Sequence, residues 1–464
     1  MARLFGTNGI REVVGGPLTA PFVTQISAAI ASAAPVDRPI AVGWDGRTSS
    51  PALSRIVSAT LSLAGHRVIE LGLLPTPAVQ YSVPRVGAGL GVIVTASHNP
   101  PEFNGIKCIA ADGLEASREF EEAVEQAAER RTTPAVSFDR VGDISSDLQG
   151  AHRYLDGILA QVDRAQIAAR KFTIVLDCAN GASVVTSPSL LRRLGCRVVT
   201  INGQVDGTFP GHPPEPTEAH LADLKRAVTA TGADLGIAHD GDADRAVYVD
   251  STGRYIPGEE MLALLAQDAV RRHRGGVVVT SISSPQSIED AVRPLGGTVE
   301  YTRVGSPAIS HAMQRTGAVF GGEDNGGLIF PEFQIARDGA MSVAATLGLL
   351  ARLGRPLPEL LGELPHYALV KEKIACPVAL RDPVLARVTE SLRVGAEKLV
   401  TIDGLKVYRD GGWVLVRPSG TEPLLRIIAE AKEFAAARAI VDRALASVRE
   451  AISAAESDRR TVSG

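Results

Sequence analysis

Short apolar runs rich in β-branched residues alternate with helical segments along most of this 464-residue chain. The run GLGVIVT at 89–95 is apolar nearly throughout, which is typical of a strand buried on both faces of its sheet. Regular alternation of strands and helices is the pattern of layered α/β folds. The sequence therefore predicts the α/β class, and a chain of this length can build more than one buried core.

The alternation divides the chain into successive units. We expect four of them, spanning 1–150, 151–252, 253–366 and 367–464. The units share the same order of strands and helices, but no sequence repeat aligns between them.

Strands are expected at the apolar runs 39–43, 89–95, 172–177, 197–201, 233–238, 246–250, 276–280, 298–302, 318–321, 370–374, 404–409, 412–417 and 425–430. Helices are expected at 52–64, 118–130, 187–194, 258–272, 285–292, 308–315, 339–353 and 435–455. We interpret the polar stretch 132–150 as a linker and the polar tail 456–464 as a frayed end.

The composition argues against several classes of partner. Lys plus Arg is 48 and Asp plus Glu is 52, so the net charge of −4 provides no basic field for nucleic acid. Aromatic residues make up 4%, too few for a stacking platform on single strands. The sequence contains no run of about 18 apolar residues, so it predicts no membrane-spanning helix. We therefore expect no nucleic-acid partner and no membrane.

Cysteine usage and the first residues bear on the compartment. The four cysteines form no CxxC pair, which argues against structural zinc and against a disulfide scaffold. The chain begins MARLFGT, without the apolar run of a signal peptide. These features predict a cytoplasmic protein.

The loop TASHNP at 95–100 directly follows the predicted buried strand at 89–95. A serine at a strand end, such as Ser97, is well placed to act as a nucleophile or to carry a phosphate. The loop lacks the glycines of the G-x-S-x-G elbow of serine hydrolases. A Ser/Asn turn that ends at Pro100 is the structural alternative.

The segment HDGDADR at 239–245 contains three carboxylates, Asp240, Asp242 and Asp244. Spaced by two, they can converge on one side of an extended segment, where their repulsion makes a divalent cation the natural partner. The segment does not match a Ca²⁺-binding EF-hand loop. Counted from Asp240, the sixth position is Arg245 where the loop needs Gly, and the twelfth is Ser251 where it needs Glu. Mg²⁺ is preferred, since a few carboxylates plus a phosphate oxygen suit it.

Two glycine-containing loops follow in the second half of the chain. In GGEDNGG at 321–327, Glu323 and Asn325 can accept hydrogen bonds from vicinal hydroxyls, or the loop is a plain acidic turn. In RPSGTEP at 417–423 the donors of a phosphate cradle are present, and the alternative is a turn between strands. These donors are Arg417, Ser419, Gly420 and Thr421, with Arg426 just beyond. The Walker pattern is absent.

Two further cations stand near these motifs in sequence. Arg11 closes FGTNGIR and can reach a substrate phosphate, and Lys107 lies ten residues after Ser97. Either could be an ordinary surface charge. Among the nine histidines only His98 and His239 fall in the candidate loops, and no paired spacing suggests zinc.

Together and in this order, the motifs resemble the α-D-phosphohexomutase family over the whole length of the chain. FGTNGIR, TASHNP, DGDADR, GGEDNGG and RPSGTEP carry the resemblance. It implies four domains around a central cleft: three related α/β domains with mixed sheets and a C-terminal α+β domain.

The resemblance also implies roles at the reacting centre. Ser97 would be a phosphoserine, and Arg245 would contact its phosphate. One Mg²⁺ per subunit would be held by that phosphate with Asp240, Asp242 and Asp244. Lys107 and Arg11 would serve proton transfer and charge stabilisation, and His98 is counted with the catalytic residues.

The remaining implied roles concern the sugar and its second phosphate. Glu323 and Asn325 would bind sugar hydroxyls. The phosphate that does not react would be held by Arg417, Ser419, Gly420, Thr421 and Arg426. Asn325 stands where the commoner family form has Ser, and GGEDNGGLIFP is similar to the archaeal phosphoglucosamine mutase branch. Glu12 stands where many relatives have Gly.

The implied activity interconverts hexose 6-phosphate and hexose 1-phosphate through a hexose 1,6-bisphosphate, which also serves as activator. Glucosamine phosphate is the favoured substrate, with phosphomannomutase or phosphoglucomutase activity as the alternative. We expect a monomer or homodimer. A HAD-type phosphatase with Asp240 as nucleophile leaves Ser97 and 417–423 without a role, and the intact motifs argue against a binding protein without turnover.

Overall fold

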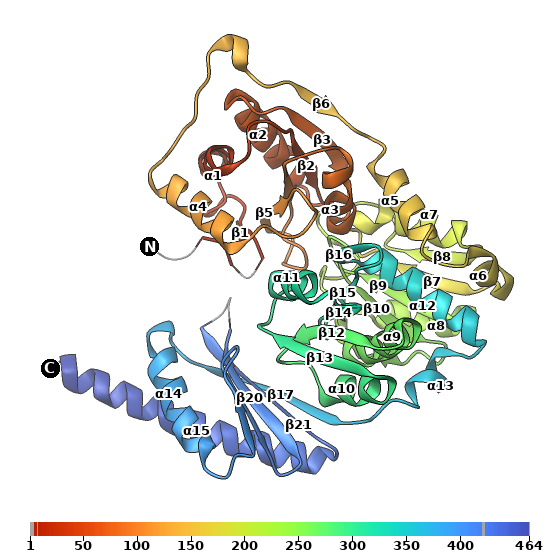
Figure 1. Ribbon diagram of the computed structural model, residues 1–464, viewed down its shortest axis with the longest axis vertical. Helices are drawn as coiled ribbons and strands as arrows, with labels where there is room; N and C mark the ends of the chain where they lie inside the picture. The colour runs from red at the N-terminus through yellow and green to blue at the C-terminus, as the bar shows by residue number, and fades with distance from the viewer. Residues whose placement is uncertain (1–3, 7, 420–422, 464) are drawn as a thin grey trace.

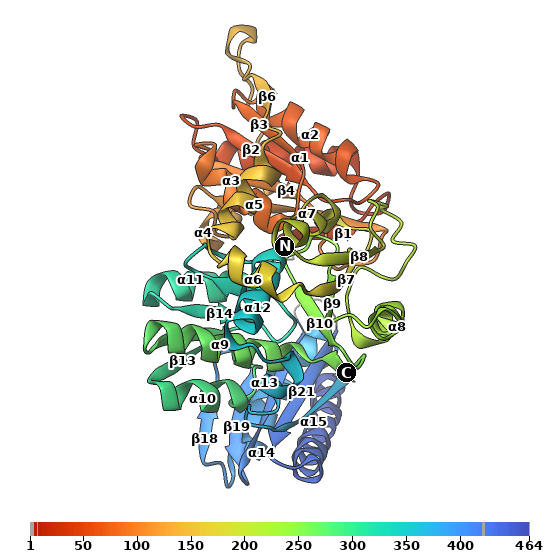
Figure 2. The same cartoon turned by 90° about the vertical axis from the view of Figure 1, so that its right-hand side faces the viewer.

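The computed structural model describes residues 4–6, 8–419 and 423–463. Four β-sheets follow one another along the chain, each with its own helices. Figure 1 shows the first unit in red and orange at the top, the second and third in yellow to cyan at the right, and the fourth in blue at the lower left. In the view of Figure 2 the blue unit lies at the opposite end of the molecule from the first.

The first sheet has six strands in the order β1-β5-β4-β2-β3-β6, and β5 runs antiparallel to both of its neighbours. Its strands are β1 (Ile10–Val13), β2 (Ile40–Trp44), β3 (Val68–Leu73), β4 (Leu90–Val94), β5 (Phe103–Ala110) and β6 (Ile144–Ser146). Its helices are α1 (Ala20–Ala33), α2 (Ser50–Leu63), α3 (Thr76–Arg85) and α4 (Arg118–Glu129). The expected linker at 132–150 therefore contains a short edge strand, β6, which pairs with β3.

The second sheet has the order β11-β10-β9-β7-β8. Its strands are β7 (Thr173–Asp177), β8 (Arg197–Ile201), β9 (Leu235–His239), β10 (Ala246–Asp250) and β11 (Tyr255–Ile256). The accompanying helices are α5 (Gly150–Leu159), α6 (Arg164–Arg170), α7 (Ser187–Arg193) and α8 (Ala222–Thr231). Because β11 pairs with β10, this sheet extends beyond residue 252, where we expected the second unit to end.

The third sheet has the order β13-β12-β14-β15-β16. Its strands are β12 (Gly276–Ser281), β13 (Gly297–Thr302), β14 (Phe320–Gly322), β15 (Leu328–Phe330) and β16 (Gln334–Arg337). Its helices are α9 (Gly258–His273), α10 (Gln286–Val292), α11 (Ser306–Thr316), α12 (Gly339–Leu353) and α13 (Leu357–Leu361).

The three sheets share one topology. In each, the first two strands of a four-strand motif are parallel, the third pairs parallel with the first, and the fourth returns antiparallel to the third. The motifs are β2-β3-β4-β5, β7-β8-β9-β10 and β12-β13-β14-β15. The shared strand order shows that the three units are built alike, although their sequences do not align by eye.

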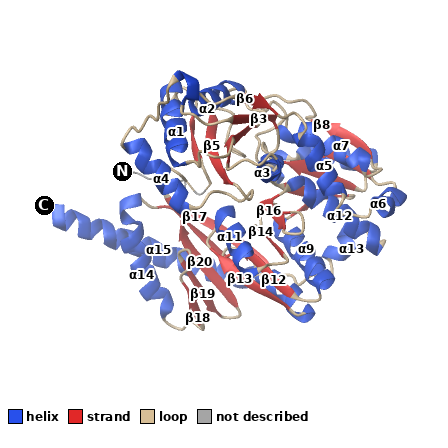
Figure 3. Ribbon diagram, turned by 45° about the horizontal axis from the view of Figure 1, so that its top comes forward, coloured by secondary structure: helices blue, strands red, loops and turns tan. Residues whose placement is uncertain are grey.

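The fourth sheet is wholly antiparallel, in the order β17-β21-β20-β19-β18. Its strands are β17 (Ala368–Ala375), β18 (Lys398–Val400), β19 (Leu405–Arg409), β20 (Gly412–Pro418) and β21 (Leu424–Ala431). Two helices, α14 (Arg381–Arg393) and α15 (Phe434–Ser463), pack against one face of it (Figure 3). The prediction of a frayed end from 456 is wrong, because α15 continues to Ser463. The segment 456–463 contains no Gly or Pro that would end the helix.

The apolar cores divide unequally among the units. One core runs from α3 and α5 through the second and third sheets to α12 and α13. The first and fourth sheets keep separate cores under their own helices. No helix among the described residues is both long and apolar enough to cross a membrane. The expected α/β class, with three mixed sheets and a distinct C-terminal unit, is confirmed.

Candidate functional site

The sequence candidates of the first three units lie at equivalent places in their sheets. Each lies in the connection from the third to the fourth strand of the shared motif. Ser97 lies between β4 and β5, the three aspartates lie between β9 and β10, and Glu323 and Asn325 lie between β14 and β15. The sequence motifs indicated the loops, but the equivalence became visible only in the topology.

The three carboxylates converge in the β9–β10 connection. Asp240, Asp242 and Asp244 are all buried, and one oxygen of each lies within 4.8 Å of the others. The expectation of an extended segment is wrong, because the chain turns here and Ala243 adopts a left-handed φ of 56°. The turn, rather than strand alternation, brings the carboxylates together.

The electrostatics of the cluster are unequal. Burial and the repulsion of Asp244 and Asp242 raise the pKa of Asp240 well above its usual range. Burial also acts to raise the pKa of Asp242, but Lys107, whose ammonium lies 2.9 Å from Asp242 Oδ2, outweighs it and holds that pKa low. The Thr76 hydroxyl donates to the same oxygen at 2.7 Å.

Two acceptors of the cluster without a hydrogen-bond partner also fit a metal ion. Asp242 Oδ1 and Asp244 Oδ1 are buried and have no hydrogen-bond partner. Buried acceptors of this kind are normally satisfied, and a cation would satisfy both. Carboxylate oxygens are the ligands that hard cations such as Mg²⁺ prefer.

Ser97 lies against the cluster. Its Oγ donates to Asp240 Oδ2 at 3.1 Å, and its side chain is inaccessible to solvent. Ser97 itself has a left-handed φ of 53°, a conformation that costs a non-glycine residue about 1–3 kcal/mol. The structure therefore holds this hydroxyl at a defined point beside the carboxylates.

A buried arginine that the sequence motifs did not reveal holds the Ser97 loop. Arg47 pairs with Asp45 at 3.2 Å and is 1% exposed. Its guanidinium donates at 2.5–2.8 Å to the carbonyls of Ser97, Asn99, Pro100 and Phe103. The sequence signal would have been a charged residue in the DGR turn just after the apolar strand β2.

The predicted cations and His98 gather around the same cluster. Lys107, on β5, is buried in its ion pair with Asp242 and is not a surface charge. Arg11, on β1, donates to Asn99 Oδ1 at 2.9 Å. Arg245 donates to His98 Nδ1 at 2.8 Å, and its Nε lies 3.7 Å from an oxygen of Asp240 and of Asp244.

Two of these groups have shifted pKa values. The positive charge of Arg245, with burial, lowers the pKa of His98 far below its ordinary value, so His98 is neutral and accepts from Arg245. Burial lowers the pKa of Arg11, although Asp242 partly opposes the shift. Arg11, Lys107 and Arg245 thus set three cations around three carboxylates.

The sugar loop predicted at 321–327 is held by its own contacts. Glu323 is 5% exposed; its Oε1 accepts from the Gly305 amide at 3.1 Å and its Oε2 from Arg337 at 2.9 Å. Asn325 is half-buried, and its Oδ1 accepts from the Gly327 amide at 3.1 Å. Asp324 pairs with Lys371 of β17 at 3.1 Å, which joins this loop to the fourth unit.

The phosphate cradle predicted at 417–423 lies at the β20–β21 hairpin. Arg417 and Arg426 face each other across the two strands, and the Ser419 amide donates to the Leu424 carbonyl. Gly420 and Thr421 lie outside the described residues. Arg417 pairs with Asp403 at 3.0 Å, and Asp403 also accepts from the Val304 amide at 3.2 Å. The next amide along the chain, that of Gly305, donates to Glu323. The consecutive amides of Val304 and Gly305 therefore connect the β20–β21 hairpin to the loop at 321–327.

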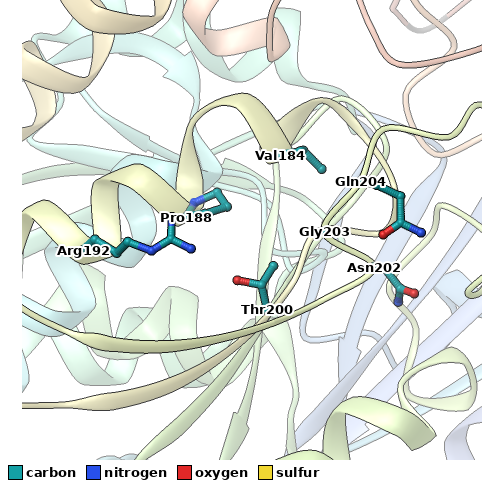
Figure 4. Close-up of a pocket in the computed structure, with 7 residues that line it drawn as sticks. All are labelled: Val184, Pro188, Arg192, Thr200, Asn202, Gly203 and Gln204. Atoms are coloured by element: carbon teal, nitrogen blue, oxygen red, sulfur yellow. The ribbon is translucent and has the colours of Figure 1, made fainter.

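A separate hollow of about 450 Å³ lies in the second unit, between α7 and the end of β8 (Figure 4). It is lined by Val184, Pro188, Arg192, Thr200, Asn202, Gly203 and Gln204. None of these belongs to the residues predicted for the site.

The sequence and fold match one family along almost the whole chain. Residues 2–135, 152–253 and 257–367 match α/β/α domains I, II and III of phosphoglucomutase/phosphomannomutase, and 372–447 match its C-terminal domain. A probable phosphoglucosamine mutase of Methanopyrus kandleri is 40% identical, over 97% of this chain and 99% of the relative. A phosphoglucomutase/phosphomannomutase of Thermococcus kodakarensis is 38% identical, over 97% of this chain and all of the relative.

A solved structure of the same family has a closely similar fold. A crystal structure of a phosphoglucomutase/phosphomannomutase family protein from Burkholderia thailandensis superimposes with a TM-score of 0.84 and 28% identity, and 98% of each chain is covered. The matched domains, the shared topology of three sheets and the buried aspartate cluster point the same way. The chain belongs to the α-D-phosphohexomutase family and is a phosphohexomutase similar to phosphoglucosamine mutases.

Proposed function

We propose that this enzyme interconverts hexose 6-phosphate and hexose 1-phosphate through a phosphoserine at Ser97, with glucosamine phosphate as the preferred sugar. The observation that carries the proposal is the position of the Ser97 hydroxyl, 3.1 Å from Asp240 Oδ2 at the edge of the buried carboxylate cluster. Phosphoryl transfer needs charge neutralisation and alignment more than covalent help from other side chains. The surrounding cations supply charge neutralisation, and the carboxylates would hold a metal ion that aligns the phosphoryl group.

The metal proposed for the cluster is Mg²⁺, held by Asp240, Asp242 and Asp244 with the Ser97 phosphate. When bound, it would neutralise charge on the phosphoryl group. Arg245 lies beside Asp240 and Asp244, where it can contact the same phosphate. Arg11 adds a second guanidinium at this end of the site.

The first transfer breaks the bond between phosphorus and Ser97 Oγ and forms a bond from phosphorus to the free hydroxyl of a hexose monophosphate. The hydroxyl loses its proton and Ser97 Oγ gains one. Lys107 is our candidate to relay this proton, because its ammonium is held at the cluster by Asp242: it gives one proton to Ser97 Oγ and, then neutral, takes up the one that the hydroxyl releases. His98, which is neutral and accepts from Arg245, fixes the guanidinium next to the reacting phosphate.

The second transfer uses the other phosphate of the hexose 1,6-bisphosphate. The sugar turns in the site and returns that phosphate to Ser97, which regenerates the starting enzyme. Glu323 and Asn325 would bind the sugar hydroxyls, and Arg417, Ser419, Gly420, Thr421 and Arg426 would hold the phosphate that is not reacting. Added hexose 1,6-bisphosphate is expected to activate the enzyme, because it phosphorylates Ser97.

The choice of sugar rests on the loop at 321–327 and on the relatives. Asn325 stands in a loop similar to the archaeal phosphoglucosamine mutase form, and the M. kandleri relative carries that name. The name of the T. kodakarensis relative makes glucose and mannose phosphates the alternative.

The test is a comparison of kcat/KM on glucosamine, glucose and mannose 6-phosphates, with Mg²⁺ and hexose 1,6-bisphosphate present. We expect the highest value on glucosamine 6-phosphate. A higher value on glucose or mannose 6-phosphate would replace our preferred substrate and leave the phosphoserine mechanism standing. Activity that persists in the Ser97→Ala variant would overturn the mechanism itself.

A further inference from the structure

Arg337, the last residue of β16, connects the metal loop and the sugar loop. Its Nη2 donates to Asp244 Oδ2 at 2.5 Å and its Nη1 to Glu323 Oε2 at 2.9 Å. The residue is 6% exposed. No motif in the sequence analysis contained it, and the proposed mechanism gives it no role.

The contact is specific in geometry. A guanidinium is a rigid planar fork, so two carboxylates that bind its two Nη atoms are held at a fixed separation. A buried cation is also costly unless it is paired, and both of its partners here are buried carboxylates. The two partners come from different connections, β9–β10 and β14–β15.

The neighbouring sequence leaves room for this arginine. A Cβ at residue 327 would lie 2.4 Å from Arg337 Cδ, so Gly327 gives the side chain its path. Gly327 also donates to Asn325, so the arginine packs directly against the loop proposed to read the sugar.

We propose that Arg337 is a positioning residue that couples sugar binding to the metal site. The proposal rests on the roles proposed above for Glu323 and Asp244. The guanidinium orients Glu323 toward the sugar hydroxyls, and its positive charge offsets part of the negative charge of the aspartate cluster. Loss of this side chain should therefore weaken sugar binding and strengthen metal binding.

The test uses Arg337→Met, which keeps an unbranched side chain and removes the fork and the charge. Removing a cation beside the cluster should lower the Kd for Mn²⁺, used as a probe in calorimetry, by about tenfold. Losing the charge-assisted bond that orients Glu323 should raise KM for glucosamine 6-phosphate by about tenfold. A residue needed only for folding would weaken both.

Arg337→Lys separates charge from geometry. A lysine keeps the cation but cannot bridge two carboxylates as a planar fork, so Mn²⁺ affinity should stay near that of the parent while KM rises. This variant also carries the test if Arg337→Met does not fold. The matched control is Arg272→Met, which removes a surface arginine that bridges Asp268 and Glu332 through its Nε and Nη1 and should change neither quantity.

The outcomes are distinct. Tighter Mn²⁺ with weaker sugar binding in Arg337→Met, and weaker sugar binding alone in Arg337→Lys, support the coupling. Weaker Mn²⁺ binding in Arg337→Met, or a KM for Arg337→Lys equal to that of the parent, overturns it. If the parent shows no mutase activity, the proposed function fails, but Mn²⁺ titration with and without glucosamine 6-phosphate still reports the coupling.

Discussion

Two hairpin connections at equivalent positions in related sheets have different characters. In the β9–β10 connection every residue from Asp240 to Arg245 is buried, and its carboxylates are opposed by buried cations. In the β14–β15 connection Glu323 alone among the polar side chains is buried, while Asp324 and Asn325 are half-buried between pairs of glycines. The first is a charged centre enclosed by protein; the second is a narrow backbone turn that offers polar groups at its edge.

On the proposed function, this difference assigns two tasks to one topology. The shared strand order delivers three connections to one place, and the residues within each decide its chemistry. Where charge must be concentrated, the chain supplies carboxylates and encloses them, which raises the pKa of Asp240 through burial and repulsion. Where the sugar is proposed to bind, the glycines would let it approach the backbone.

The largest effect should come from the charged loop. Asp240→Asn removes one charge from the proposed metal site, so we expect kcat/KM to fall by about a thousandfold. The same change relieves repulsion within the cluster, so the metal-free variant should gain about 1 kcal/mol in free energy of unfolding. Steady-state kinetics and chemical denaturation in a chelator measure the two. Loss of both activity and stability would show that the cluster is structural.

A third hairpin, β20–β21, extends the comparison to a loop proposed to hold phosphate. An arginine makes charge-assisted bonds to phosphate worth about 1.5–3 kcal/mol, so Arg417→Ala should lower kcat/KM by about tenfold to a hundredfold. More free hexose 1,6-bisphosphate should escape during turnover, and Mg²⁺ dependence should be unchanged. Assays with and without added bisphosphate check this; kinetics equal to the parent would remove the loop from the site.

Glu323→Gln examines the sugar loop itself. The change keeps the shape but removes the charge that pairs with Arg337 and is proposed to bind the sugar, so KM for glucosamine 6-phosphate should rise by about tenfold. The Mg²⁺ concentration needed for activity should shift far less than in Asp240→Asn. A fall in kcat with unchanged KM would instead place Glu323 in the chemical step.

The smallest effect is expected at the edge of the same loop. In Asn325→Ser a hydroxyl can still accept from the Gly327 amide as a local turn, so total activity should stay within about threefold of the parent. The ratio of kcat/KM values for glucosamine and glucose phosphates is the sensitive measurement. An unchanged ratio would show that Asn325 does not determine the sugar.

The sequence predicted those elements whose residue types suit their place in the fold, such as apolar residues in a buried strand or an N-cap at the start of a helix. β4 is apolar throughout and was expected within one residue at each end; α12 has an Asp338 N-cap and its bounds were as expected. β5 was not expected, because it carries Asn104 and Lys107 at buried positions where function rather than packing selects the residue. The three exposed residues of β6 gave no apolar signal, and α14 was also not expected.

In the candidate site too, some residues could be predicted from the sequence and others could not. Motifs in single loops predicted Ser97, the aspartates and Glu323, because each short segment groups several residues that can bind a ligand or a metal ion. Arg47, Thr76 and Arg337 were missed, since each acts on a loop distant in sequence and stands in no motif of its own. Only the folded topology brings these side chains to their partners.

The central claim is that Ser97 carries the transferred phosphoryl group above the aspartate cluster. The direct measurement is to incubate the enzyme with hexose 1,6-bisphosphate and Mg²⁺, remove the sugar, and locate phosphate by intact mass and peptide mapping. We predict a mass increase of one phosphoryl group on Ser97, which disappears when excess hexose monophosphate is added and does not form in Ser97→Ala. Phosphate found on Asp240, or full mutase activity in Ser97→Ala, would contradict the account.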